Sequence, residues 1–151
     1  MDTLGPYILE ELEKGNKVKF TVSGNSMFPL FSNRRDSVIL KRVKDAGEIK
    51  KFDIVFYRRL SGQYVLHRVL KKHKSHLVIA GDGEVEKEYG VDCGQVFAKV
   101  VSFTRKGKAA TIDSKYYKIY VFLWNMVFPL RYFILNVAFG VRRMLGGKKC
   151  K

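Results

Sequence analysis

The chain has 151 residues, a length that suits one globular domain with an appendage. Its hydrophobic fraction of 46% excludes a mainly disordered chain. The 29 lysines and arginines outnumber the 14 aspartates and glutamates, which gives a net charge of +15; residues 105–151 hold 11 basic and 1 acidic side chains, a net of +10. This imbalance predicts an anionic partner for the C-terminal end, either lipid headgroups or nucleic acid.

Residues 1–16 are expected to form a short helix that docks on the rest of the domain. Pro6 suits the first turn of a helix, Ile8 and Leu12 lie on one apolar stripe, and Gly15 can end the helix. The same segment has neither a basic stretch nor a long apolar run, so we expect no signal peptide and no N-terminal membrane anchor.

Residues 17–113 have the pattern of a β domain, because short apolar runs alternate with turn residues. Val18, Phe20 and Val22, for example, alternate with polar side chains as in a half-buried strand. We expect short strands at residues 17–22, 37–40, 52–57, 64–70, 76–80, 96–103 and 108–112. The fold class predicted is mainly β, a barrel or sandwich with a short N-terminal helix and a long apolar C-terminal helix.

The third segment, residues 114–151, is basic and apolar. Residues 119–141 are expected to form one helix, bent near Pro129, that could reach roughly 34 Å and so cross a bilayer. Arg131 near its middle opposes insertion. We therefore favour a helix lying in the headgroup plane of an anionic membrane, with a spanning helix, a hydrophobic hairpin or packing in solution as alternatives. The expected membrane contacts are Trp124, Arg131, Arg142 and Arg143.

Cysteine content does not indicate a disulfide or metal site. Cys93 lies in a loop-like stretch and Cys150 in the polar tail, so both are expected to be free thiols. No zinc-ligand spacing is present, and we expect neither a metal nor a cofactor.

Three candidate catalytic side chains lie in separate segments. Ser26 belongs to the segment SGNSMFP, in which Gly24 permits a tight turn that can aim a hydroxyl and backbone N–H groups outward. His67 lies in the apolar run YVLHRVL, and Asp82 lies between two glycines at the end of another apolar run. Each also has an ordinary structural explanation: a hydrogen-bonded turn serine, a buried core histidine and a turn aspartate.

These segments, in this order, resemble the type I signal peptidase superfamily over about residues 18–104. The similar features are SG-x-SM-x-P, then HRV on an apolar strand, then GD closing another strand. The resemblance is to the branch with a Ser–His arrangement, found in endoplasmic reticulum and archaeal signal peptidases, and to the peptidase domain of phage and SOS repressors.

That resemblance implies a role for each residue. Ser26 would be the nucleophile and His67 the general base. Asp82 would orient His67, with Glu88 as the alternative, because an aspartate of the family stands at the position of Glu88. The Ser26 N–H and the Ser23 hydroxyl would hold the oxyanion.

The function implied is that of a serine endopeptidase of signal peptidase I type, which cleaves a precursor or leader polypeptide at a membrane. Because no export signal is seen, we expect the cytoplasmic face, with an extracytoplasmic orientation as the alternative. A repressor-like module that binds DNA or protein and a catalytically inactive family member are the competing functions. No helix-turn-helix precedes the β domain and the tail is rich in aromatic residues, so a nucleic-acid partner is not expected.

Overall fold

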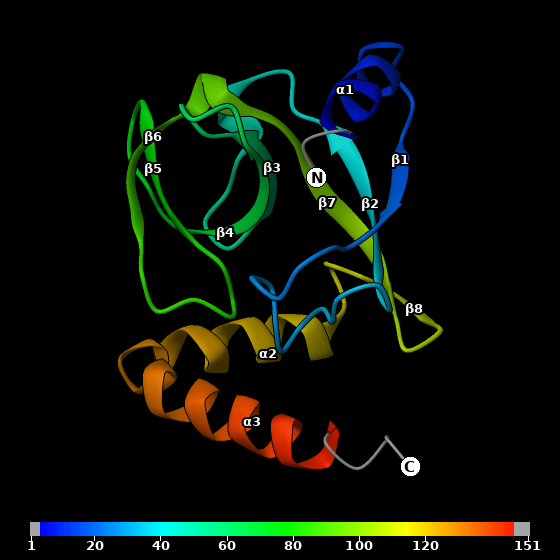
Figure 1. Cartoon of the computed structure of the whole chain (residues 1–151). Helices are drawn as coiled ribbons and strands as arrows, with labels where there is room; N and C mark the ends of the chain where they lie inside the picture. The colour runs from blue at the N-terminus through cyan, green and yellow to red at the C-terminus, as the bar shows by residue number, and fades with distance from the viewer. Residues whose placement is uncertain (1–3, 147–151) are drawn as a thin grey trace.

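The computed structural model describes residues 4–146, without the side chains of residues 139 and 142–146. Its main element is one antiparallel sheet of eight strands, with helices on its outside (Figure 1). The strands are β1 (Val18–Thr21), β2 (Ser37–Arg42), β3 (Ile54–Arg58), β4 (Tyr64–Lys72), β5 (His76–Ala80), β6 (Glu88–Asp92), β7 (Val96–Arg105) and β8 (Lys108–Thr111). They follow the order β1-β2-β7-β3-β4-β5-β6, and β8 pairs with β7. The prediction of a mainly β fold is confirmed at this level.

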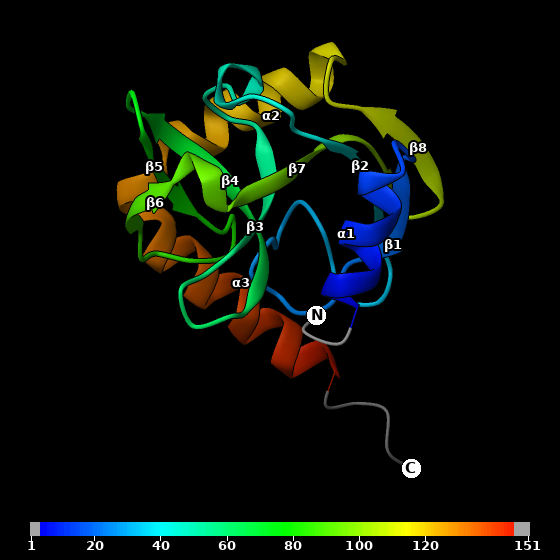
Figure 2. The ribbon, with the colours of Figure 1, turned by 90° about the horizontal axis from the view of Figure 1, so that it is seen from above.

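The helices are short. The α-helices are α1 (Gly5–Glu13), α2 (Lys115–Met126) and α3 (Arg131–Gly146), and the 3₁₀ turns are η1 (Ala46–Glu48), η2 (Cys93–Gln95) and η3 (Phe128–Leu130). The expected N-terminal helix is confirmed as α1, which buries Ile8 and Leu12 against the sheet beside β1 and β2 (Figure 2).

Strand β3 is buried on both faces, and the protein therefore has two hydrophobic cores. Successive side chains of a strand point to opposite faces of its sheet. Ile54 and Phe56 accordingly belong to a first core that also holds α1 and α2 residues. Val55 and Tyr57 belong to a second core formed with β4 and β5. The same alternation in β4 decides the position of the candidate histidine.

Strand β6 has no counterpart among the expected strands. Only Val91 of its five residues is buried, so the segment lacks the apolar alternation typical of a strand. It nevertheless pairs with β5 at the sheet edge, with Glu88 opposite Ile79. This pairing brings an acidic side chain next to the second core.

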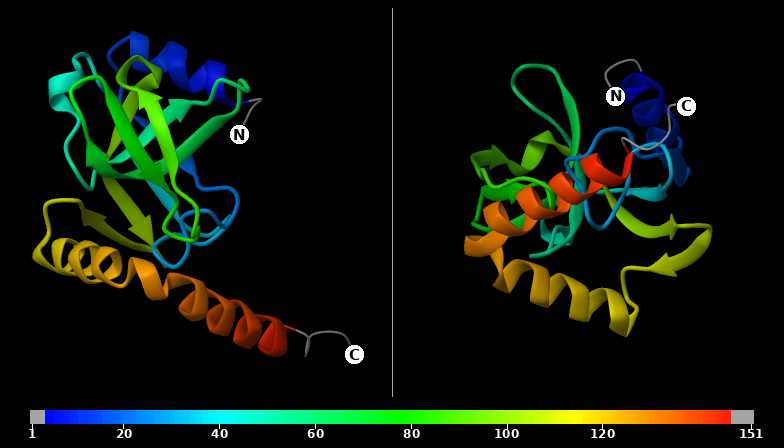
Figure 3. Two further views of the ribbon diagram at one scale, coloured as in Figure 1. Left: turned by 90° about the vertical axis from the view of Figure 1, so that its left-hand side faces the viewer. Right: turned by 60° about the horizontal axis from the view of Figure 1, so that its bottom comes forward.

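The expected bend near Pro129 is present, but one continuous helix over residues 119–141 is not confirmed. The chain forms α2 and α3, separated by η3 and bent by 65°. Pro129 explains the break, because proline lacks the N–H that a helix interior requires and its ring clashes with the preceding turn. Within the described residues no single helix is long and apolar enough to cross a bilayer, although α2 and Phe128–Ala138 together satisfy length and composition. Both helices lie at the end of the β domain away from α1 (Figure 3).

Candidate active site

Ser26 lies on the loop between β1 and β2, which is fixed at both ends. Val22 and Met27 are almost fully buried on either side of it. Gly24 has a φ of +91°, a conformation that side chains disfavour, and its N–H donates to Asn33 Oδ1 at 3.0 Å. The loop thus holds a half-buried Ser26 on a tight turn, as its sequence predicts.

His67 projects from β4 into the second core, on the same face as Val65 and Val69. Only 1% of it is exposed. Its Nδ1 lies 3.1 Å from Glu88 Oε1 and 3.3 Å from the Tyr57 hydroxyl. Because an ionised carboxylate only accepts hydrogen bonds, Glu88 favours the neutral tautomer in which Nδ1 carries the hydrogen and Nε2 carries a lone pair.

His67 lies beside the loop that carries Ser26. Ser26 and His67 line one pocket of about 250 Å³, together with Ser23 and Glu84. Nε2 lies 3.5 Å from Glu84 Oε1 and makes no hydrogen bond within the described residues. Ser26 and His67 thus share a pocket, but no hydrogen bond joins the Ser26 hydroxyl to Nε2. Catalytic hydrogen bonds often tighten only when substrate binds.

The charges around His67 favour its protonated form. Burial acts to lower the pKa of His67, but the neighbouring carboxylates of Glu84 and Glu88 outweigh burial and raise that pKa above its usual value. Burial acts to raise the pKa of Glu88, but His67 and Arg59 together hold it well below the usual value. Both neighbouring carboxylates can thus stabilise an imidazolium ion.

Asp82 does not contact His67 but forms a buried ion pair with Arg68. The two carboxylate oxygens of Asp82 accept from Nε and Nη2 of Arg68, each at 2.7 Å, and both residues are fully buried. The adjacent residues His67 and Arg68 point to opposite faces of β4, so a carboxylate that pairs with one cannot orient the other. The expectation that Asp82 orients the base is corrected, and Glu88, the alternative, lies at Nδ1.

Two of the residues that were expected to contact a membrane, Arg131 and Trp124, contact the β domain instead. Arg131 is fully buried, and Trp124 is half-buried with its indole N–H donating to the Asp82 carbonyl at 3.0 Å. Both side chains face the β domain instead of the outer surface of the helices. The side chains of Arg142 and Arg143 lie outside the described residues.

Sequence inspection missed three residues of this site. Tyr57 resembles any other apolar strand residue, Arg59 follows a strand in an ordinary turn, and Glu84 belongs to a segment that resembles a solvated acidic edge. Arg59 donates to Glu88 through Nε at 3.0 Å, over a separation of 29 residues. The pairing of β3, β4, β5 and β6 in one sheet brings these residues together.

The cluster of His67, Glu84 and Glu88 is close enough to be considered as a metal site, since one ligand atom of each lies within 4.8 Å of the others. However, both oxygens of Glu88 are hydrogen-bonded to the Arg59 guanidinium, which neutralises the carboxylate and would repel a cation. Glu88 also lies at Nδ1 while Glu84 lies at Nε2. A hydrogen-bonded base fits this arrangement better than a metal ligand set.

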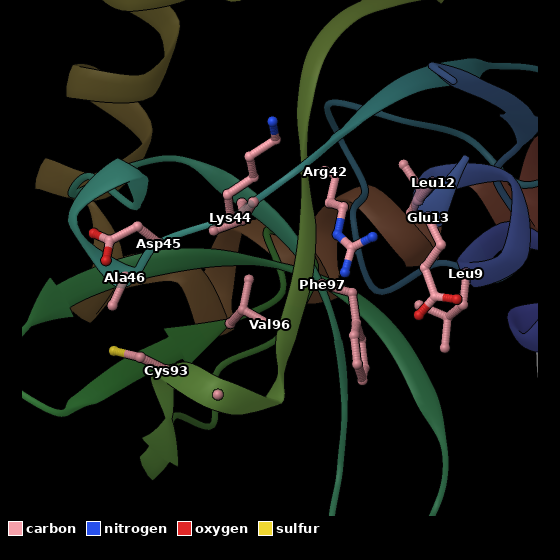
Figure 4. Close-up of a pocket in the computed structure, with 12 residues that line it drawn as sticks. Leu9, Leu12, Glu13, Arg42, Lys44, Asp45, Ala46, Cys93, Val96 and Phe97 are labelled. Atoms are coloured by element: carbon pink, nitrogen blue, oxygen red, sulfur yellow. The ribbon is translucent and has the colours of Figure 1, made fainter. Parts of the chain in front are cut away.

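Another pocket, of about 280 Å³, lies between α1 and the ends of β2 and β7 (Figure 4). Arg42, Phe97 and Leu9 lie toward one side of it and Cys93 toward the other. None of the candidate catalytic residues lines this pocket.

Comparisons of the chain with protein-family models, with curated proteins and with solved structures found no significant match. The resemblance to the signal peptidase superfamily therefore stays a prediction from three short motifs. The function is inferred below from the geometry of the site.

Replacing Asp82 with asparagine should lower the free energy of unfolding by about 3–5 kcal/mol, because the fully buried Arg68 would lose its counter-ion. Denaturant unfolding followed by circular dichroism measures this change. Asp113→Asn is the control, since the Asp113 side chain is 87% exposed and should contribute almost nothing. Equal stability of the two variants would contradict the structural role of Asp82.

Replacing Glu88 with glutamine should change the pH dependence of the peptide cleavage that the sequence motifs predict. A general base must be neutral, so activity falls as the pH drops through the raised pKa of His67, above its ordinary 6.5. Without the Glu88 charge that pKa falls, and the acid limb of kcat/KM moves to lower pH. The maximal rate should also fall, on the order of 10²–10⁴-fold, because an amide can bond the unwanted tautomer. Glu86→Gln, an exposed neighbour, is the control, and an unmoved acid limb in E88Q would contradict the prediction.

Proposed function

We propose that this chain is a serine endopeptidase of signal peptidase I type, with the corresponding β fold, that cleaves a precursor or leader polypeptide. One observation carries the proposal: Ser26 and His67 line the same pocket, while Glu88 bonds Nδ1 of His67 and leaves Nε2 without a hydrogen-bond partner among the described residues. Ser26 and His67 are 41 positions apart in the sequence, by the difference of their numbers, and the fold brings them together. A carboxylate, an imidazole and a hydroxyl in this order form the arrangement that activates serine nucleophiles.

The proposed reaction uses each group at a stated atom. Nε2 of His67 takes the Ser26 proton as Oγ attacks a peptide carbonyl, and Glu88 and Glu84 stabilise the imidazolium that forms. The backbone N–H of Ser26 and the hydroxyl of Ser23, which lines the same pocket, would bind the oxyanion. His67 then gives its proton to the leaving amine, and water hydrolyses the acyl-enzyme.

Ser26→Ala should abolish cleavage of an unfolded polypeptide, with a rate loss on the order of 10⁴-fold or more. The assay follows peptide fragments by mass spectrometry over time. Ser75→Ala, at an exposed position outside the pocket, is the matched control and should cleave like the unaltered protein. Full activity of Ser26→Ala beside an equally active control would reject the Ser–His mechanism.

We further propose that the peptidase works on an anionic membrane, which it binds through the outer face of α2, η3 and α3. This outer face is the set of exposed apolar side chains Tyr116, Ile119, Phe122, Leu123, Met126, Leu130, Tyr132, Phe133, Ile134, Val137 and Val141. Large exposed apolar patches mark interaction surfaces in proteins. The 65° bend and the short helices favour helices that lie in the interface over a spanning segment.

Charge favours lipid over a second copy of the chain as the occupant. Neither α2 nor α3 contains an acidic residue, and the exposed Lys115 and Lys118 begin α2. Two copies meeting through this face would bring together segments that each carry a net of +10, from 11 basic and 1 acidic residues in 105–151. Anionic headgroups instead attract such a segment.

The double variant Phe122→Ser/Phe133→Ser should bind vesicles more weakly, by roughly 10- to 100-fold for each phenylalanine, following the ~1.5–3 kcal/mol of a buried aromatic side chain. Co-sedimentation compares vesicles of phosphatidylcholine with vesicles that also contain phosphatidylglycerol, at low and high salt. The unaltered protein should prefer the anionic vesicles and release them as salt rises. Leu60→Ser, a 97% exposed position on the β3–β4 turn, is the control. Equal binding of both variants, or dimerisation in place of vesicle binding, would contradict this proposal.

A further inference from the structure

Arg131 holds the segment 81–84 at both of its ends. From the first position of α3, its Nη1 donates to the carbonyl of Gly81 at 3.0 Å and to the carbonyl of Glu84 at 3.3 Å. The guanidinium lies over the ring of Phe128, 4.3 Å from its centroid, and is fully buried. Carbonyl oxygens and an aromatic face thus surround this cation.

The middle of the same segment is held from α2. Trp124 donates to the Asp82 carbonyl at 3.0 Å, and the hydroxyl of Tyr120 donates to Asp82 Oδ2 at 3.3 Å. The ion pair of Asp82 with Arg68 ties this point to β4. The segment 81–84 is therefore fixed by contacts from both C-terminal helices and from the sheet.

The opposite side of the segment contacts the candidate catalytic groups. The N–H of Gly83 donates to the Ser26 carbonyl at 2.7 Å. A Cβ atom at Gly81 would lie only 2.3 Å from that same carbonyl oxygen, so the approach requires glycine. Glu84 at the end of the segment faces Nε2 of His67 at 3.5 Å.

We propose that Arg131 is a positioning residue, which fixes the segment 81–84 so that Ser26 and Glu84 keep their places relative to His67. This role in catalysis rests on the proposed peptidase function, but the positioning of Glu84 does not. Arginine suits the role because its planar guanidinium holds Nη1 against both carbonyls of the segment while Nη2 lies 3.5 Å from the carbonyl of Trp124, whereas lysine carries a single nitrogen on a flexible stem.

Arg131→Lys should lower kcat/KM by about 100-fold, mostly through kcat, because a displacement of about 1 Å between reacting groups costs that much. The matched control is Arg42→Lys, the same chemical change in the pocket of Figure 4, which shares no residue with the catalytic pocket. Arg42→Lys should cleave like the unaltered protein. A folded Arg131→Lys protein with unchanged kcat/KM would overturn the role in catalysis.

A second measurement does not need activity. The groups that face His67 are Tyr57 from β3, Glu88 from β6 and Glu84 from the held segment, with Arg59 bound to Glu88. If Arg131 positions Glu84, replacing Arg131 moves the Glu84 carboxylate away from Nε2 of His67. The NMR titration of the His67 ring should then move to lower pH in Arg131→Lys but not in Arg42→Lys. An unmoved titration would overturn the positioning of Glu84.

The two measurements separate this proposal from the proposed function. Should Ser26→Ala and the unaltered protein prove equally inactive, the peptidase assignment fails while the His67 titration still decides the role of Arg131. Should Arg131→Lys not fold, Arg131→Gln replaces it, because its side chain carries no buried charge and removes the guanidinium that bonds the Gly81 and Glu84 carbonyls. It should give a loss of similar size and the same direction of titration shift, and no change in either would overturn the proposal.

Discussion

The buried ion pair of Arg68 with Asp82 is the interaction on which the arrangement of this protein depends. Arg68 also donates to the carbonyl of Phe52 and to the hydroxyl of Tyr117, so one guanidinium joins β4, the segment before β3, the end of β5 and α2. Two full charges removed from water are tolerated only when every donor and acceptor is satisfied. That requirement fixes where the C-terminal helices can dock.

Strand β4 separates this structural task from the chemical one. Arg68 points into the first core and the adjacent His67 into the second, because neighbouring side chains of a strand lie on opposite faces. The histidine is thus held in a rigid, water-poor setting by the same backbone that carries the ion pair. Its raised pKa is the balance of burial against two nearby carboxylates.

Sequence patterns predicted the parts of the site that depend on local chemistry. The turn at Gly24, the alternation around His67 and the docking stripe of α1 all follow from side-chain spacing, and the structure has each of them. The partner of His67 was harder to predict. Glu88 reaches it only through an edge strand with one buried residue, whereas Asp82 stands in the segment that matches the family motif.

The C-terminal segment also has a feature that sequence patterns could not predict. Its composition correctly indicates apolar helices, but composition alone cannot show that Arg131 turns inward to backbone carbonyls and aromatic rings. A buried cation without a carboxylate partner is rare enough that a lipid-facing position was the natural expectation. The inward position of Arg131 depends on contacts with residues about fifty positions away in the sequence.

The length of the turn η3 sets the rotational phase of α3 relative to α2. An α-helix advances about 100° per residue, so one added residue in this turn would rotate Arg131 away from the Gly81 carbonyl and bring a different side of α3 against the β domain. The same rotation would bring some apolar side chains of the outer face against the β domain. A single insertion between Val127 and Arg131 would thus turn the last helix by a little more than a quarter of a turn and change which side chains it buries, whatever residue were inserted.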